Sequence, residues 1–118
     1  MGMTDVELTI KNPDDKTKSV TGDFLVDSGA GYTVIPANFV QKLNLKPSFY
    51  RQFKLADGKK IRRPVGSAII RYGTEEIATP VVLGKLGDSA LLGALTLESF
   101  GLALDPFQRK LYRAAMML

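Results

Sequence analysis

The residues best suited to catalysis are Asp27-Ser28-Gly29-Ala30, which directly follow the apolar residues Phe24-Leu25-Val26. Strand interiors disfavour Asp, and a carboxylate that leaves water is costly unless it is partnered or protonated. Two carboxylates that share one proton can activate a water molecule, one acting as base and the other as acid. The sequence holds no second Asp-Ser-Gly or Asp-Thr-Gly. A second carboxylate of this kind would therefore have to come from another copy of the chain.

Asp-Ser-Gly is also ordinary turn chemistry, because Asp and Ser cap turns and Gly accepts a positive φ. Here the tripeptide lies between two segments of core type. Residues 22–26 are typical of a short buried strand, and residues 31–36 return to β-branched and aromatic residues before a Pro. A surface turn is not usually flanked in this way, so the context favours a catalytic role for the motif over a simple turn.

The amino-acid composition further limits the kinds of catalysis that are possible. The chain has 118 residues, of which 45% are hydrophobic and 24% charged, as expected for a single globular domain spanning 1–118. It has no Cys and no His, which excludes disulfides, Ser-His and Cys-His catalysis and ordinary zinc sites. We expect no metal and no cofactor, and carboxylates remain the main catalytic candidates.

The sequence predicts neither a membrane-spanning helix nor a signal peptide. No apolar run approaches the roughly 20 residues of a spanning helix, and the N-terminus has neither the basic region nor the apolar core of a signal peptide. We therefore expect a cytoplasmic protein with no membrane partner.

Basic residues give a formal net charge of +4 and are densest at Lys59–Arg63. They are scattered elsewhere, and no aromatic platform of the kind that binds single-stranded nucleic acid accompanies them. We interpret them mainly as a solvated face that could favour acidic peptides as substrates. A small basic nucleic-acid-binding β domain is the disfavoured alternative, and no nucleic-acid partner is expected.

Turn signals and alternation predict an all-β domain with little helix. Asp57-Gly58 suits a type I′ turn, residues 14–18 have the composition of an exposed turn, and Pro36–Leu43 has the start signal and apolar spacing of a short helix. The expected strands are Val6–Ile10, Ser19–Val26, a hairpin over Arg51–Arg62, and the pair Gly66–Tyr72 and Ile77–Leu83.

Two motifs together resemble those of the retropepsin-like (clan AA) aspartic proteases, most closely the small prokaryotic single-domain members. In that family a hydrophobic-hydrophobic-Asp-Thr/Ser-Gly-Ala segment is followed downstream by hydrophobic-hydrophobic-Gly and a short helix that ends in Phe/Ile-Gly. Leu91-Leu92-Gly93 and Phe100-Gly101 match the second part. The resemblance covers nearly the whole chain. It implies an all-β retropepsin-like acid protease fold with one short helix near the C-terminus, assembled as a symmetric homodimer.

The resemblance also implies roles for individual residues. Asp27 would be the catalytic residue, and Ser28, Gly29 and Ala30 would support it, with Ser28 bonding across the dimer axis. The Leu55–Ile61 hairpin takes the place of the family's flap, a β-arm that closes over bound peptide. The residues expected to bind substrate are Gly29, Gly31, Ala56, Asp57, Gly58 and Leu92.

The sequence departs from the viral members at the dimer brace. Those enzymes typically have an acidic residue just after the Ala of the motif and an Arg after the downstream Gly, whereas this chain has Gly31 and Ala94 there. The absence of both partners indicates a different way of bracing the dimer. By the same resemblance, Val6–Ile10 and Leu111–Leu118 are assigned to the subunit interface.

The sequence thus favours an aspartic endopeptidase in which two Asp27 carboxylates, one per subunit, activate a water molecule that hydrolyses a peptide bond of a peptide or protein substrate. The alternative is an inactive retropepsin-fold module that binds peptide or serves as a scaffold. Cleavage that depends on Asp27 separates the two.

Overall fold

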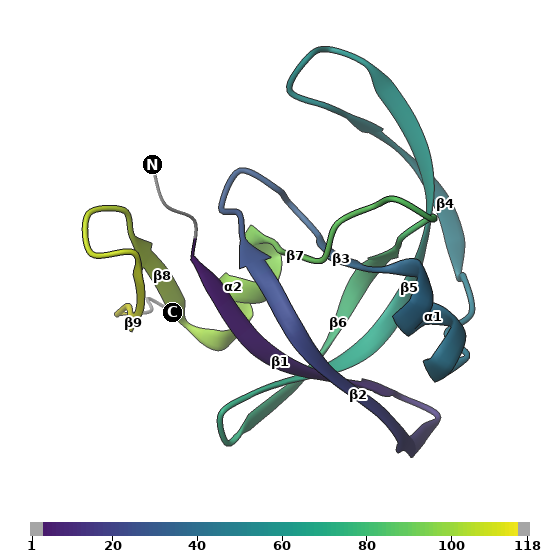
Figure 1. Cartoon of the computed structure of the whole chain (residues 1–118), viewed down its shortest axis with the longest axis horizontal. Coiled ribbons are helices and arrows are strands. Elements are labelled where there is room, and N and C mark those ends of the chain that lie inside the picture. The colour runs from purple at the N-terminus through teal and green to yellow at the C-terminus, as the bar shows by residue number, and fades with distance from the viewer. Residues whose placement is uncertain (1–3, 116–118) are drawn as a thin grey trace.

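The computed structural model describes residues 4–115, which form nine strands and two seven-residue helices (Figure 1). In chain order they are β1 (Asp5–Asn12), β2 (Asp15–Val26), β3 (Thr33–Ile35), α1 (Ala37–Leu43), β4 (Phe49–Lys54), β5 (Lys60–Tyr72), β6 (Glu75–Leu83), β7 (Leu91–Leu92), α2 (Ala94–Phe100), β8 (Leu102–Asp105) and β9 (Lys110–Arg113).

Seven strands form one sheet in the order β1-β2-β7-β3-β6-β5-β4, which curls until β1 also pairs with β5. The long strand β5 makes this closure possible. Its residues 60–65 pair with β4, residues 69–71 pair with β1, and residues 65–72 pair with β6 on the other side. The β4–β5 hairpin therefore projects from the barrel as an arm, at the top of Figure 1.

The core fills the interior of this barrel and follows the period-2 alternation of the strands. Leu8 and Ile10 on β1 are fully buried, and Phe24 on β2 is buried against the same cluster. Each such side chain contributes about 1.5–3 kcal/mol of burial free energy. Because Leu8 and Ile10 serve the chain's own core, contact of Val6–Ile10 with a second copy stays a prediction.

Both helices begin and end at residues suited to those positions. Pro36, with φ −65°, precedes α1, and Asn44 ends it in the left-handed region. Gly101 ends α2 in the same region, with φ 69°. The short helices expected at Pro36–Leu43 and near the C-terminus are confirmed, and so is the mostly-strand fold.

Two local predictions are wrong. Residues 15–18 are exposed as expected, but they belong to β2, which begins at Asp15 rather than near Ser19. The turn at the tip of the arm is not type I′. Gly58 has φ 86°, but Asp57 lies outside the positive-φ region that a type I′ turn requires at both central residues. A three-residue loop results, closed by Leu55 N donating to Lys59 O at 2.7 Å.

The C-terminal strands lie outside the seven-stranded sheet. β8 and β9 form a separate two-stranded sheet, in which Leu111 packs against the core and Tyr112 is exposed. The last three residues of the expected interface segment Leu111–Leu118 lie outside the described residues. No helix within residues 4–115 has the length and apolarity needed to cross a membrane.

Candidate active site

Asp27 lies at the point where β2 ends, and the parallel pairing of β2 with β7 fixes it there. Val26 pairs with Leu92, and the next amide, Asp27 N, donates to Leu92 O at 3.0 Å. Ala30 N then donates to Asp27 O at 3.1 Å, which closes a tight turn. Asp27 N is therefore fixed to β7 and Asp27 O to the loop's own turn, and the side chain between them is half-buried.

The Asp27 carboxylate is oriented by its own loop. Its Oδ1 accepts a hydrogen bond from Gly29 N at 3.0 Å. Ser28 and Gly29 are exposed, whereas Ala30 is half-buried. Within residues 4–115 the Ser28 hydroxyl makes no hydrogen bond to protein, so its expected partner across a dimer axis stays a prediction.

The start of α2 holds this loop from behind. The first amides of a helix have no partner inside the helix. Here Ala94 N donates to Ala30 O at 2.7 Å and Leu95 N donates to Gly31 O at 2.9 Å. These bonds fix the loop that carries Asp27 to the helix that follows the second motif.

Gly93 explains why that second motif ends in glycine. A Cβ built on Gly93 would lie 2.5 Å from both the carbonyl carbon and the oxygen of Tyr32, and 3.0 Å from Ala30 O. These atoms are backbone and cannot yield as a flexible side chain would. Only glycine lets β7 and α2 approach the Asp27 loop this closely.

A buried hydroxyl pair completes the support, and sequence reasoning missed it. Thr33 on β3 and Thr96 on α2 are both fully buried, with their Oγ atoms 2.6 Å apart. Gly93 N donates to Thr33 Oγ at 3.0 Å. A polar residue on the buried face of each element was the signal available in the sequence.

A cleft of about 550 Å³ opens in front of Asp27. It runs between the Asp27 loop, the β4–β5 arm and the segment before β7. Of the predicted site residues, Asp27, Gly29, Ala30, Gly31 and Ala56 line it.

Three of the predicted substrate-binding residues lie elsewhere. Leu92 is only 1% exposed and belongs to the core, so that prediction is corrected to its neighbour Leu91, which lines the cleft. Asp57 and Gly58 are at the tip of the arm, beyond the cleft lining, where Asp57 Oδ1 accepts a hydrogen bond from Lys59 N at 2.9 Å.

The arm contacts the Asp27 loop through aromatic side chains. Phe53 on β4 meets Tyr32 edge-on, with ring centroids 5.7 Å apart. Ile61, directly opposite Phe53 on β5, also lines the cleft. The wall of the cleft opposite the loop is therefore apolar at its centre.

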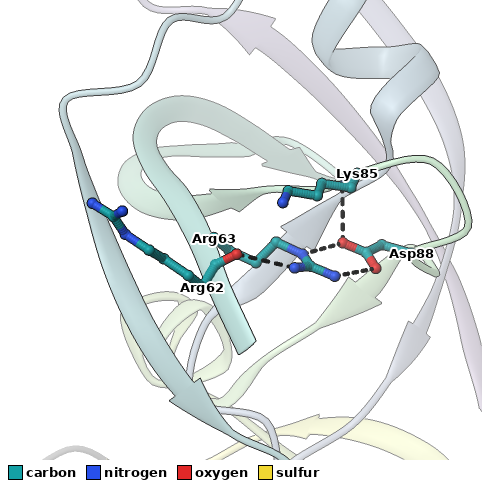
Figure 2. Close-up of polar contacts among 4 residues, drawn as sticks. All are labelled: Arg62, Arg63, Lys85 and Asp88. Carbon is teal, nitrogen blue, oxygen red and sulfur yellow. Dashed lines mark hydrogen bonds and ion pairs between the residues drawn. The ribbon is translucent and has the colours of Figure 1, made fainter. Parts of the chain in front are cut away.

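A half-buried ion pair, also missed from the sequence, ties the base of the arm to the segment before β7 (Figure 2). Arg63 donates from Nε to Asp88 Oδ2 at 2.7 Å and from Nη2 to Oδ1 at 3.0 Å. Lys85 N adds a bond to Oδ2 at 2.9 Å. These hydrogen bonds lower the pKa of the Asp88 carboxyl, and the same contact raises the pKa of Arg63. Both residues line the cleft.

The described part of the chain offers no set of side chains that could bind a metal ion. Within residues 4–115 no group of three or more Asp or Glu side chains is placed to hold a metal ion. The acidic group in the cleft that is free of an ion pair within those residues is Asp27.

Comparisons with known proteins agree with this arrangement. Residues 16–99 match the model of a protein family described as gag-polyprotein putative aspartyl protease. Among solved structures, the crystal structure of a retropepsin-like aspartic protease from Rickettsia conorii matches with a TM-score of 0.52 and 20% identity, covering 89% of each chain. At that identity the likeness is one of fold. No curated protein matches significantly.

Proposed function

The chain belongs to the family described as gag-polyprotein putative aspartyl protease and has a retropepsin-like fold, and we propose that it is a homodimeric aspartic endopeptidase. Each subunit supplies one Asp27, and the two carboxylates together form the catalytic centre. The observation that carries this proposal is the Asp27 carboxylate itself, held by Gly29 N at the edge of an open cleft.

The proposed chemistry uses one proton shared by the two Asp27 carboxylates. The ionised carboxylate takes a proton from a bound water, while the protonated one donates to the oxygen of the scissile carbonyl. Water oxygen bonds to the carbonyl carbon and gives a tetrahedral diol. As the C–N bond breaks, the carboxyl that took the water's proton passes it to the leaving nitrogen. One hydroxyl of the diol gives its proton to the other carboxylate, so the pair again shares one proton.

The surroundings of Asp27 suit this chemistry. Gly29 N bonds Oδ1, which leaves Oδ2 available to a water or to the partner's carboxylate. Gly29, as an exposed residue without a side chain, lets an extended peptide approach closely. The arm forms the other side of the cleft, with Ala56 as the candidate main-chain contact to the peptide.

An inactive peptide-binding or scaffold module is the second candidate. The observation in its favour is Ala94. The Ala94 amide donates a hydrogen bond to the Asp27 loop, but its methyl side chain has no charged group that could brace a dimer. If two copies do not associate, the cleft would still accept a peptide but would hold one carboxylate only.

Digestion of a peptide library by the protein and by Asp27→Asn separates these candidates. Asn keeps the acceptor for Gly29 N but cannot act as a base, so we expect cleavage to fall to background. Folding should survive, because the change also removes repulsion between two close carboxylates. The control is Asp23→Asn, on the same strand and exposed, which should cleave as the parent does. Comparable cleavage by Asp27→Asn would refute the proposed function.

A further inference from the structure

Positive charge is concentrated on the arm. Between Phe49 and Arg63 the chain has six basic residues and one acidic residue, so this segment alone is more positive than the whole chain, whose formal net charge is +4. We call residues 49–63 the basic hairpin. Its basic residues are Arg51, Lys54, Lys59, Lys60, Arg62 and Arg63.

These like charges face one another across the hairpin and repel. Lys54 pairs directly across from Lys60, and Arg51 directly across from Arg63. Like charges at opposed positions destabilise a strand pair. Arg63 is neutralised by Asp88, but the other five basic side chains make no ion pair within residues 4–115. The hairpin thus carries unbalanced charge at some cost to its own stability.

Two of the guanidinium groups are held in place by aromatic rings. Arg51 lies over the ring of Phe49 at 5.0 Å, and Arg62 lies over the ring of Tyr50 at 4.9 Å. Cation–π contacts of this kind restrict the side chain and keep its charge. Figure 2 shows Arg62 extending away from the Arg63–Asp88 pair. The free charge of Arg62 is therefore directed away from the intrachain acid.

The basic hairpin forms one wall of the cleft. Phe53 and Ile61 give that wall an apolar centre, and Lys54 lines it beside them. A polypeptide in the cleft would meet apolar groups near Asp27 and positive charge farther along the arm. Acidic side chains would be repelled beside Asp27 but attracted at the hairpin.

We propose that the basic hairpin selects acidic polypeptide segments, so that preferred substrates carry Asp or Glu a few residues away from the scissile bond. This inference rests on the proposed protease function. A polypeptide fits better than a nucleic acid, because Arg51 and Arg62 already cover the rings that would have to stack on bases. The attraction acts over about 8 Å at physiological ionic strength and increases the rate of encounter.

The test uses a peptide found by the library digest, synthesised with two Glu flanking the cleaved segment and again with two Gln. For the parent protein we expect kcat/KM to be about tenfold higher for the Glu peptide at low salt. The difference should lie in KM and shrink in 1 M NaCl, where the screening length falls to about 3 Å.

The hairpin variant Lys59→Gln/Lys60→Gln should reduce the Glu-to-Gln ratio several-fold. Its matched control is Lys16→Gln/Lys18→Gln, which removes the same charge from the exposed start of β2, at the far end of the molecule in Figure 1. The control should keep the parent's ratio. Equal kcat/KM for the two peptides, or an equal drop in the Glu-to-Gln ratio in both double variants, would overturn the inference.

A binding measurement separates this inference from the proposed function. Fluorescence anisotropy with the Asp27→Asn protein reports recognition without cleavage. It uses two labelled peptides that do not depend on the library digest, one apolar segment flanked by two Glu and the same segment flanked by two Gln. Preference for the Glu peptide that weakens in the hairpin variant supports the inference even if the parent cleaves nothing. Absence of that preference contradicts it even if the parent is an active protease. Displacement of the Glu peptide by a lower concentration of a 20-nucleotide single strand would contradict it in favour of a nucleic-acid partner.

Discussion

The Asp27 loop and the β4–β5 arm face each other across one cleft but are built in opposite ways. The loop is tied to β7 by Leu92 O, to α2 by Ala94 N and Leu95 N, and beneath them lies a buried threonine pair. The arm has exposed side chains along nearly all of β4 and one three-residue loop at its tip. The fold thus concentrates its buried contacts on the loop that carries the carboxylate and leaves the opposite wall largely exposed.

The largest effect that this contrast predicts is at Gly93. In Gly93→Ala the new Cβ meets the Tyr32 carbonyl at 2.5 Å, so β7 and α2 must move away from the Asp27 loop. We expect the free energy of unfolding to fall by about 3 kcal/mol, measured by urea denaturation. The control is Gly31→Ala in the same loop, where a Cβ meets nothing within 4 Å. Equal stability of the two variants would show that the loop is not packed as described.

A smaller loss is expected for Thr33→Val. The change leaves Gly93 N without its acceptor and Thr96 without its buried partner. An unsatisfied buried group costs about 1–3 kcal/mol, so thermal denaturation should show clear destabilisation. Thr9→Val is the matched control, because Thr9 makes a similar hydroxyl pair with Thr21 that is exposed. Its stability should change by less than about 0.5 kcal/mol.

The smallest effect is expected at the Arg63–Asp88 pair, which ties the base of the arm to the segment before β7. The pKa of Asp88 is lowered in the folded chain, so the pair stabilises the protein above the ordinary Asp pKa of about 3.9. That contribution is lost as the pH falls through the lowered value. Asp88→Asn should therefore cost about 1 kcal/mol at pH 7, and the difference from the parent should vanish in strong acid.

Urea denaturation of the parent and of Asp88→Asn at a series of pH values measures this difference. Asp14→Asn, at an exposed residue that forms no ion pair within residues 4–115, serves as control and should match the parent throughout. A gap between Asp88→Asn and the parent that widens toward acid would contradict the assigned sign.

Local signals in the sequence were sufficient for the parts of the site that are contiguous in the chain. The Asp27 motif at a strand end and the hairpin around Asp57-Gly58 each depend on neighbouring residues, and the structure has both elements there. Their catalytic and binding roles stay predictions, since the Asp27 of a second copy is needed to test them.

Contacts between distant residues could not be predicted in the same way. Arg63 and Asp88 are 25 positions apart and Thr33 and Thr96 are 63 apart, and no local pattern pairs them. The error at Leu92 has a related cause. β7 has two residues, too few for alternation to reveal which of Leu91 and Leu92 faces the cleft. Its pairing with β2, which decides this, comes from outside the segment.

The central claim is that one catalytic centre needs Asp27 from two chains, and mixing experiments test it most directly. With the parent protein held at fixed concentration, added Asp27→Asn protein should capture parent chains in dimers that hold a single carboxylate. At a tenfold excess of the variant, cleavage of a saturating peptide should fall to about a tenth, because most parent chains then have a variant partner. Asp27→Asn/Gly93→Ala, whose loop is disrupted, should inhibit less at the same excess. Cleavage that stays at the parent's rate throughout the titration would mean that a single chain carries the whole active site, and would contradict the account.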